Sequence, residues 1–259
     1  MKSLPIFDFH LHPGYDFHEN DTDRDRFVAL LKKNGVVGAA GSFINLDLYK
    51  KPVEEFSWRI PECNQRVWEW HDAYPDFFVP GIHVHPDHLT LSGEEMEKHR
   101  ARGGVLVGEI VYYMMGFQYD HPSMLSLLDM ARSLDLVVNL HPSKNMAKNR
   151  HITKNLPGLK IVLAHLDGYG LYEDFIREMK QNENVWVDLS AYGADRPGML
   201  SDAVNRVGSE RILFGTDFPG SKPETKERRY YDYVLSEKLS YEAVENILYR
   251  NAYRLLRLA

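Results

Sequence analysis

The chain has 259 residues, of which 44% are hydrophobic and 12% aromatic, which suits one large domain with a substantial core. Its formal net charge of -6 gives no overall basic field, so extended nucleic-acid binding is not favoured. A single cysteine, Cys63, excludes an intramolecular disulfide framework. The N-terminal sequence MKSLPIFDFHLH lacks the features of a secretory signal, and no stretch is apolar enough to cross a bilayer. We therefore expect a single domain over residues 1–259 in a cytoplasmic protein, with no nucleic-acid or membrane partner.

Eight apolar, β-rich runs recur along the chain, and several are continuous, as expected for strands that helices cover. They span residues 5–12, 36–43, 78–83, 105–110, 136–141, 160–165, 185–189 and 211–216. Segments of helical period or composition lie between or after them, at residues 23–34, 61–74, 123–134, 172–181, 198–207 and 240–258. Pro61 suits the first turn of its helix, and Ser240 suits the N-cap of the last helix. The alternation predicts an α/β fold, a single (β/α)8 TIM barrel, with an open doubly wound sheet as the competing architecture.

Polar and apolar residues alternate along the first run. The side-chain period of two places Asp8, His10 and His12 on one face, and Phe7 and Phe9 on the other. Because aromatic side chains suit the helix-facing side, we expect the polar trio to face the barrel axis. His10 and His12 would then lie at the upper rim and share one ion, with Asp8 a layer deeper as an acceptor behind the ligands. A pair of hydrogen-bonded core histidines is the alternative.

Metal-type side chains also end four later runs. Glu109 follows VLVG, and a carboxylate there needs a cation or a donor because its desolvation is costly. We expect a metal ligand that bridges two ions, with a salt bridge to Arg102 as the alternative. His141 and His165 end the fifth and sixth runs and are expected to be ligands rather than core histidines. Asp217, in FGTDFPG, could bind a metal and accept a proton from metal-bound water.

The carboxyl ends of strands in a closed barrel converge on one axis, so these six residues on five strands predict a single metal site there. An open site that contains carboxylates suits catalysis, whereas structural zinc sites are usually closed tetrahedra of Cys and His. We expect one or two divalent ions, with zinc as the first choice and manganese, iron or cobalt as alternatives. A separation of more than about 10 Å between the first-strand histidines and Asp217 would contradict this prediction.

Further polar residues follow the strands that form the rim. His83 and His85, in GIHVHPDH, share a face and are expected to contact substrate or a second ion. The other candidates for binding a substrate carboxylate or phosphate, with surface placement as the alternative, are Lys144, Tyr112, Tyr113 and Tyr192. We expect four other histidines to be solvated, namely His71, His99, His121 and His151. The tryptophans at positions 58, 68 and 70 are expected to pack over the barrel, with a subunit interface as the alternative.

Taken together, these motifs resemble those of the amidohydrolase superfamily. LAHLDG, ILFGTDFP and ENILYRNAYRLL look like its amidohydrolase-2 branch, and the resemblance spans essentially the whole chain. It implies a distorted (β/α)8 barrel with one or two divalent ions, usually zinc, at the carboxyl end of the strands. Matched by position, the first-strand ligands are His10 and His12, and the fifth-strand ligand is His141. The match makes His165 a ligand or a substrate contact, and Asp217 both a ligand and the general base.

Two departures from the family pattern matter. Binuclear members often carry a carboxylated lysine where this chain has Glu109, and decarboxylases of the branch generally lack that glutamate. Glu109 therefore favours hydrolysis and room for two ions. A fourth-strand glutamate and the GIHVH segment also resemble the TatD-type metal-dependent deoxyribonucleases, although GEIVYY and GTDFP differ from their usual GEIGLD and ETDAP.

The leading hypothesis is metal-dependent hydrolysis of a small ester, lactone or amide. Asp217 would take the proton of the attacking water, His165 or a metal would stabilise the oxyanion, and His83, His85 or Lys144 would hold a distal anion. The alternatives are decarboxylation, with Asp217 or His165 moving protons, and TatD-like phosphodiester cleavage. A binding or structural protein whose metal braces the barrel is the remaining hypothesis. The expected partner is a small-molecule substrate, and a homo-oligomer stays open.

Overall fold

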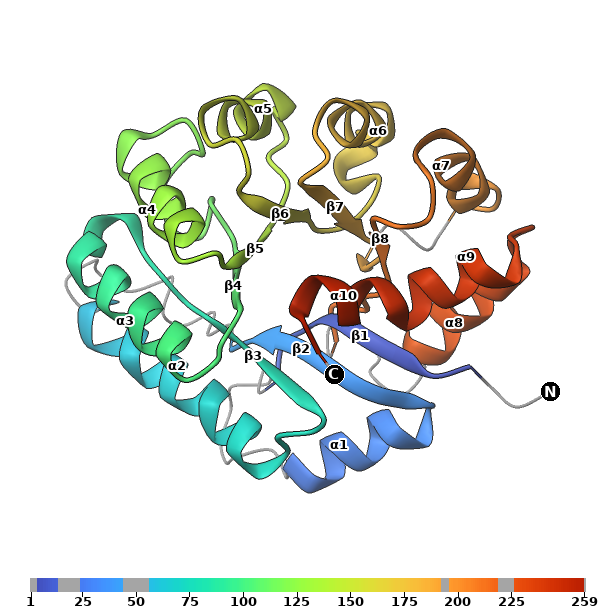
Figure 1. Ribbon diagram of the computed structural model, residues 1–259, viewed down its shortest axis with the longest axis horizontal. Coiled ribbons are helices and arrows are strands. Elements are labelled where there is room, and N and C mark those ends of the chain that lie inside the picture. The colour runs from blue at the N-terminus through green and yellow to red at the C-terminus, as the bar shows by residue number, and fades with distance from the viewer. Residues whose placement is uncertain (1–3, 14–23, 44–55, 192–195, 219–225, 259) are drawn as a thin grey trace.

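The computed structural model of the protein describes residues 4–13, 24–43, 56–191, 196–218 and 226–258. Within them, eight strands form one parallel sheet in the sequential order β1 to β8. Figure 1 shows these strands as an inner ring with helices around its outside. The strands are β1 (Ile6–Leu11), β2 (Val36–Ser42), β3 (Phe78–Ile82), β4 (Leu106–Ile110), β5 (Val137–Leu140), β6 (Lys160–Leu163), β7 (Val185–Asp188) and β8 (Ile212–Leu213).

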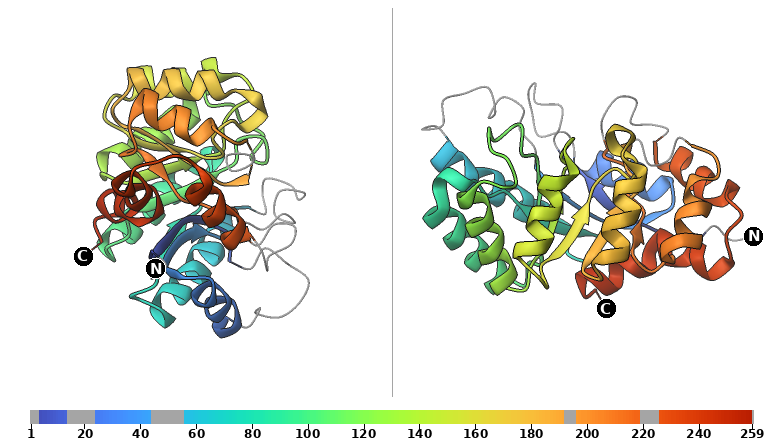
Figure 2. Two further views of the ribbon diagram at one scale, coloured as in Figure 1. Left: turned by 90° about the vertical axis from the view of Figure 1, so that its right-hand side faces the viewer. Right: turned by 90° about the horizontal axis from the view of Figure 1, so that it is seen from above.

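One helix follows each strand, and further helical segments close the chain. The first eight are α1 (Arg24–Lys33), α2 (Phe56–Ala73), α3 (Leu89–Ala101), α4 (Pro122–Ser133), α5 (Met146–Asn155), α6 (Tyr172–Gln181), α7 (Met199–Val207) and α8 (Lys226–Ser236). The C-terminal segment runs through α9 (Tyr241–Glu245), a π-helical turn (Asn246–Arg250) and α10 (Asn251–Leu256). Short 3-10 turns, Pro86–His88 and Gly168–Gly170, follow β3 and β6. In both views of Figure 2 the helices form a layer outside the strands.

The ring closes through backbone hydrogen bonds between β1 and the segment that follows β8. Phe9 N donates to the carbonyl of Phe214 at 2.9 Å, and Asp217 N donates to the carbonyl of His10 at 2.7 Å. A parallel bridge joins Leu11 to Phe218 further along the same seam. These contacts confirm the predicted (β/α)8 barrel. They also explain why β8 is shorter than predicted, because its chain leaves β7 after Leu213 and pairs with β1 instead.

The lower part of the barrel interior is apolar and is closed by the C-terminal helix. Phe7 and Phe9 pack there with Leu213 and with Leu255 of α10, in a buried cluster that draws residues from six strands. In Figure 1, α10 crosses the front of the strand ring, over one mouth of the barrel. The prediction that Phe7 and Phe9 face the helices is therefore wrong, since both side chains fill the amino end of the barrel.

A register shift reconciles these inward phenylalanines with inward histidines. The pairing of β1 with β2 slips between Asp8 and Leu11, where β1 has one residue more than its partner. Such an irregularity changes the face on which the following side chains lie. After the shift, Leu11 packs in the larger core with Phe27 and Leu31 of α1, while His10 and His12 lie inside the barrel.

The helices differ from the predicted ones in three respects. Helix α2 begins at Phe56, so Pro61 lies inside it rather than in its first turn. Helices α3, α5 and α8 were not predicted, and α3 shows why: it buries small and polar residues such as Ser92, Gly93 and Glu95, so its apolar period is weak. The last helix is interrupted by the π-helical turn, although Ser240 is its N-cap as predicted, with Oγ accepting from Ala243 N at 3.1 Å.

Several side chains outside the barrel interior are more buried than their sequence context indicated. His99 is only 1% exposed and its ring lies against Trp68, so the prediction of a solvated histidine is wrong at this position. Trp68 and Trp70 are buried in the core, as the packing prediction required, while the side chain of Trp58 lies outside the described residues. Cys63 is a buried free thiol on α2. Within the described ranges, no helix combines the length and apolar character needed to span a membrane.

Candidate metal centre

The barrel brings all six predicted metal-type residues together at the carboxyl ends of their strands. Two contacts of His12 Nε2 span the site, at 3.3 Å to Asp217 Oδ1 and 3.4 Å to Glu109 Oε2. On the far side of the same glutamate, His141 Nδ1 lies 2.9 Å and His165 Nε2 lies 3.4 Å from Oε1. The separation between the first-strand histidines and Asp217 is thus far below the 10 Å or so that would have contradicted a shared site.

The donor spacing fits a divalent cation. Two nitrogen ligands about 2.1 Å from one tetrahedral zinc ion lie about 3.4 Å apart. His10 Nε2 and His12 Nε2 are 3.1 Å apart, and His165 Nε2 and His141 Nδ1 are 3.2 Å apart. Ligand atoms in each of two triads, His10–His12–Glu109 and Glu109–His141–His165, lie within 4.8 Å of one another. Imidazole and carboxylate are ligands for zinc, manganese, iron and cobalt alike, so the donor set fits any of these ions.

Glu109 lies between the two triads and belongs to both. Its Oε2 faces the first-strand histidines, at 3.5 Å from His10 Nε2, and its Oε1 faces His141 and His165. The predicted alternative, a salt bridge to Arg102, is not formed, because Arg102 pairs with Asp72 at 3.0 Å. A carboxylate with its two oxygens turned to two separate pairs of imidazoles has the geometry of a bridging ligand.

A glycine makes the position of Glu109 attainable. Gly108 has a φ of +95°, and a Cβ atom at this position would overlap the backbone carbonyl of Asn139 on β5. Only glycine adopts this conformation without cost, so the strand can turn Glu109 into the barrel interior. His165 and Asp217 have positive φ values of 61° and 56°, which are uncommon for such residues and cluster at functional sites.

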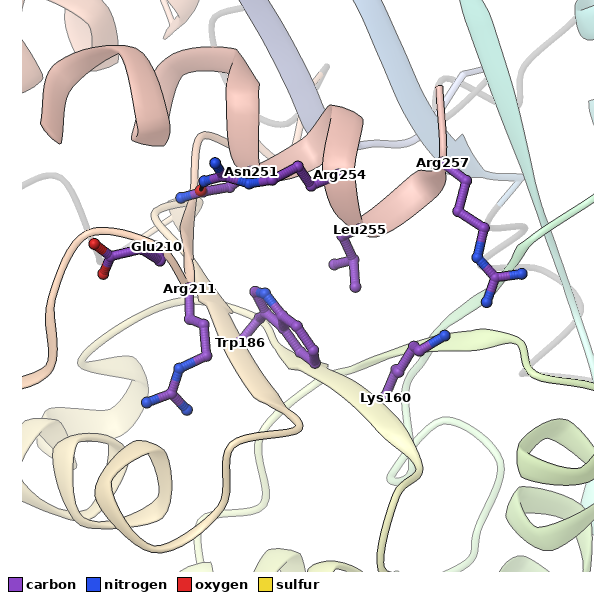
Figure 3. A pocket seen from close by; sticks show the side chains of 8 residues that line it. All are labelled: Lys160, Trp186, Glu210, Arg211, Asn251, Arg254, Leu255 and Arg257. Atoms are coloured by element: carbon purple, nitrogen blue, oxygen red, sulfur yellow. Dashed lines mark hydrogen bonds between the residues drawn. The ribbon is translucent and has the colours of Figure 1, made fainter. Parts of the chain in front are cut away.

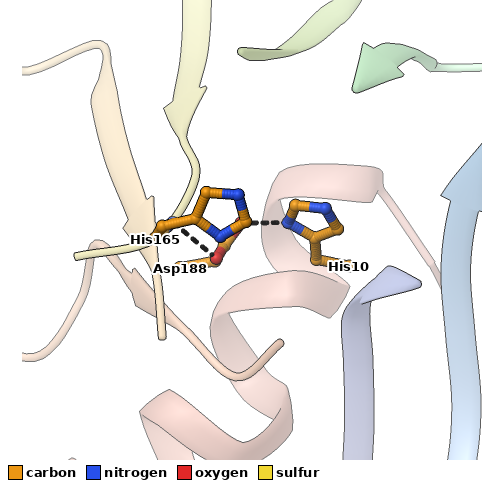
Figure 4. Close-up of side chains that lie close together, drawn as sticks. All are labelled: His10, His165 and Asp188. Carbon is orange, nitrogen blue, oxygen red and sulfur yellow. Dashed lines mark hydrogen bonds and ion pairs between the residues drawn. The ribbon is translucent and has the colours of Figure 1, made fainter. Parts of the chain in front are cut away.

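The ring of His10 is oriented by Asp188, a residue that we did not predict from the sequence. Asp188 ends β7, is fully buried, and its Oδ2 accepts from His10 Nδ1 at 2.9 Å. Its Oδ1 accepts from the backbone N of His165 at 3.1 Å (Figure 4) and from Ser190 N at 3.0 Å. A proton fixed on Nδ1 leaves the Nε2 lone pair of His10 directed at the site. The missed signal was the strand-end pattern itself, because VWVD ends in a carboxylate as VLVGE does.

Two other ligand candidates have comparable supports. His12 Nδ1 donates to the carbonyl of Ser42 at 3.0 Å, and His165 Nδ1 lies 2.7 Å from Ser190 Oγ. Asp8 was predicted to be an acceptor behind the ligands, and its Oδ1 accepts from the backbone N of His10 at 3.1 Å. It also holds the segment that carries Asp217. Its carboxylate accepts from Thr216 Oγ1 at 2.6 Å and from Thr216 N at 3.1 Å.

The imidazoles and carboxylates of the site shift one another's pKa values. Burial alone lowers the pKa of His10, but Asp188 and Glu109 outweigh it and hold this pKa well above its ordinary value. Burial also lowers the pKa of His12, but hydrogen bonds to Asp217 and Glu109 outweigh burial and raise this pKa above its ordinary value. Burial raises the pKa of Glu109, but the neighbouring His10 and His12 outweigh burial and hold this pKa well below its usual range. His12 likewise lowers the pKa of Asp217. A divalent cation would replace protons on these imidazoles, so its binding must release protons and weaken as the pH falls.

Two tyrosines and a lysine surround the outer side of His141. Tyr169 Oη lies 2.9 Å from His141 Nε2, and the Tyr113 ring lies against the same imidazole with centroids 5.2 Å apart. Both tyrosines are exposed, at 51% for Tyr113 and 40% for Tyr169. Lys144 Nζ lies 5.1 Å from the centroid of the Tyr169 ring. Tyr112 is buried, and Tyr192 lies outside the described residues.

The third-strand histidines are buried close to the site but already have neighbours. His83 Nε2 contacts the carbonyl of Phe43, and burial lowers the pKa of His83 to about 4. His85 Nδ1 accepts from Asp87 N at 3.2 Å, its ring lies against Phe117, and burial lowers its pKa to about 4. Both rings are therefore neutral at pH 7, and they would contact a substrate as polar uncharged groups.

Comparisons with known proteins agree with this architecture. A family model described as amidohydrolase matches residues 7–258, and no curated protein matches the chain. The 2,6-dihydroxybenzoate decarboxylase from Rhizobium superimposes with a TM-score of 0.74 at 18% identity, covering 100% of this chain and 99% of that one. A dihydroxybenzoic acid decarboxylase from Polaromonas, with bound manganese and the inhibitor 2-nitroresorcinol, gives 0.74 at 17% identity, with coverage of 100% and 98%. The 5-carboxyvanillate decarboxylase from Sphingomonas paucimobilis gives 0.70 at 13% identity, with full coverage (100%) of both chains.

Proposed function

Because the chain belongs to the amidohydrolase family, we propose that it is a metal-dependent enzyme that removes a carboxyl group, as carbon dioxide, from a small hydroxylated aromatic acid. The observation that carries this proposal is the pair of exposed tyrosines beside the imidazole and carboxylate cluster, because an aromatic ring could rest on Tyr113 and Tyr169 while it reaches the cluster. The likeness to decarboxylases that act on hydroxylated benzoates supports the same substrate class.

The residues that would hold a divalent ion are those whose donor atoms already converge. His10, His12 and Asp217 would form its principal set, with Glu109 between this set and the pair His141 and His165. When bound, the ion would supply Lewis-acid polarisation of the substrate's oxygen atoms. We propose zinc or manganese as that ion. Manganese gains support from the Polaromonas structure, and iron or cobalt would suit the same donors.

The proposed reaction moves one proton and breaks one carbon–carbon bond. Asp217 has a lowered pKa and is therefore ionised at neutral pH, so it can accept the hydroxyl proton of the substrate and return that proton to the ring carbon bearing the carboxylate. The bond from this carbon to the carboxylate then breaks, its electron pair stays on the ring, and carbon dioxide leaves. The product is a phenolate, which takes a proton from water. His165 is the alternative proton carrier, because its Nε2 faces the same cluster.

The outer residues would orient the substrate. Lys144 projects from the loop after β5 toward the Tyr169 ring and would attract an anionic substituent at the mouth of the site. His83 and His85 remain proposed substrate contacts, and as neutral imidazoles they suit hydroxyl or carbonyl groups better than a second carboxylate.

Hydrolysis of a small ester, lactone or amide is the second candidate function, and Glu109 is the observation that favours it. With its two oxygens turned to separate imidazole pairs, Glu109 suits a site with two cations, which is a common arrangement for hydrolysis. In that reaction Asp217 would accept a proton from the attacking water and deliver it to the leaving group.

One assay separates the two candidates. Purified protein would be analysed for its metals and incubated with hydroxylated benzoates while released carbon dioxide is measured, in parallel with an ester and lactone panel. Asp217→Asn should lower turnover by about 100-fold or more with little change in the unfolding midpoint. Asp129→Asn, an equal charge change at an exposed ion pair on α4, should have no effect. Hydrolysis without carbon dioxide release would reject the decarboxylase proposal, and full turnover in Asp217→Asn would reject both. A nuclease assay in magnesium or manganese tests the phosphodiesterase alternative.

A further inference from the structure

A cavity lies at the opposite end of the barrel from the candidate metal centre. It has a volume of about 280 Å³ and is bordered by the amino ends of β6, β7 and β8 and by α10. Its apolar surface comes from Trp186 of β7 and Leu255 of α10, which lie at the centre of Figure 3. The metal-type residues lie at the carboxyl ends of the strands, so this cavity is separate from the candidate metal centre.

Positively charged side chains surround this apolar centre. Figure 3 shows Lys160 and Arg257 on one side of Trp186, and Arg211 and Arg254 on the other. One carboxylate, that of Glu210, also lines the cavity. The whole chain carries a net charge of -6, so this concentration of cations is a local feature that the overall composition does not produce.

The four cations are only partly neutralised. Lys160 and Arg257 share a single partner, Asp135, with Lys160 Nζ at 2.5 Å from Oδ1 and Arg257 on Oδ2. Asp135 and Glu210 offset part of this charge, and Glu183 also acts on Arg211, so the four cations keep a net positive charge, which is the sign that a phosphate group requires.

The two remaining guanidinium groups are fixed by neutral oxygen atoms. Arg211 donates to the carbonyls of Asn182 at 2.8 Å and Val185 at 3.1 Å. Arg254 donates to the side-chain oxygens of Asn246, at 3.1 Å, and Asn251. Among the described residues, neither guanidinium forms an ion pair with a carboxylate. Neutral acceptors position a guanidinium without cancelling its charge, so both groups keep donors for an anion.

We propose that this cavity binds a small phosphate monoester with a single flat ring. The ring would lie against Trp186, and the phosphate would be bound by Arg254 and attracted by the charges of Arg211 and Arg257. A volume of about 280 Å³ suits a ligand of that size, since drug-sized ligands occupy about 300–1,000 Å³. The indole offers a face for stacking, and guanidinium groups bind phosphate through paired hydrogen bonds. The site is independent of the proposed reaction, because none of its residues contributes to the metal centre.

The test uses phenyl phosphate as the probe in calorimetric titrations of the purified full chain. The titrations are repeated with excess chelator, so that binding at the metal centre can be separated from binding at the amino end. We expect phenyl phosphate to bind in both conditions and more tightly than inorganic phosphate does. Arg254→Gln should weaken it by about tenfold or more, because a charge-assisted hydrogen bond is lost. Arg177→Gln, the same charge change at an exposed position on α6, should leave binding within about twofold of the wild type.

Arg257→Gln is a second variant, in case loss of the asparagine contacts unfolds the first one. Arg257 is 40% exposed in its side chain and lies near the C-terminus, so this substitution should preserve the fold and still weaken phenyl phosphate binding. Three results would each overturn the proposal. Phenyl phosphate binding could disappear when the chelator is added, it could remain unchanged in both arginine variants, or it could be no tighter than the binding of inorganic phosphate. An acidic peptide that binds while phenyl phosphate does not would overturn it too, in favour of a protein partner.

Discussion

Asp188→Asn should weaken metal binding while leaving the barrel folded. In the wild type, Asp188 Oδ2 accepts from His10 Nδ1 at 2.9 Å, and Oδ1 accepts from two backbone N–H groups. An asparagine that keeps its oxygen on the backbone donors must turn its amide NH2 toward His10. Two donors would then face each other, so the imidazole would move its proton to Nε2. That nitrogen is the one directed at His12 and Glu109, and once protonated it has no lone pair for a metal.

The expected loss is about 10–100-fold in metal affinity, as is typical when the partner of a metal-binding histidine is removed, or about 1.4–2.7 kcal/mol. The assay is competition with a chromophoric chelator, run with zinc and with manganese, after unfolding curves have shown that the variant is folded. Glu178→Gln is the matched control, because Glu178 is equally buried, lies on α6, and bonds to Thr153 and Asn182 rather than to the site. A metal dissociation constant for Asp188→Asn within about twofold of the wild type would refute this account of how His10 is oriented.

Three further predictions concern stability. Burial lowers the pKa of His99 to about 3, so between about pH 6.5 and 3 the unfolded state binds more protons than the folded state. The free energy of unfolding should therefore fall by about 2 kcal/mol from pH 7 to pH 5, and urea unfolding of His99→Leu should not show this fall. Gly108→Ala should lower the free energy of unfolding by about 1–3 kcal/mol, because φ is +95° and the new methyl overlaps the Asn139 carbonyl; unchanged stability would mean that β4 can shift freely. Phe9→Ala should cost about 3–5 kcal/mol in denaturant unfolding, since Phe9 is fully buried beneath α10, and a loss under 1 kcal/mol would contradict a packed amino end of the barrel.

The metal-type residues could be predicted because each one ends a strand, and a barrel brings strand ends together whatever the loops do. Local pattern and fold class therefore sufficed to predict that six residues lie together, namely His10, His12, Glu109, His141, His165 and Asp217. Strict alternation along β1 did not suffice, because the register shift between Asp8 and Leu11 depends on pairing with β2, which is a tertiary property. Helix α3 escaped prediction for a related reason, since its buried face is set by how closely α4 approaches Gly93 rather than by apolar period.

The residues that contact the candidate ligands were harder to predict than the candidate ligands themselves. Asp188 carries the same strand-end signal as Glu109, but only the three-dimensional structure shows that it contacts the outer nitrogen of His10. Tyr169 carries no signal of this kind. It lies in the turn after β6 with a φ of 60°, and its contact with His141 depends on that backbone conformation.

Tyr169 could satisfy His141 whether the site held one ion or two. With one ion at His10, His12 and Asp217, His141 can keep its proton on Nδ1 and donate to Glu109 Oε1, and its Nε2 then accepts from Tyr169 Oη. If a second ion were bound at the Glu109 end, Nδ1 would offer it a lone pair, and His141 would carry its proton on Nε2 and donate it to Tyr169. A phenol hydroxyl both donates and accepts, so it satisfies His141 in either state. The contact of His141 with Tyr169 would therefore suit a site with one ion or with two.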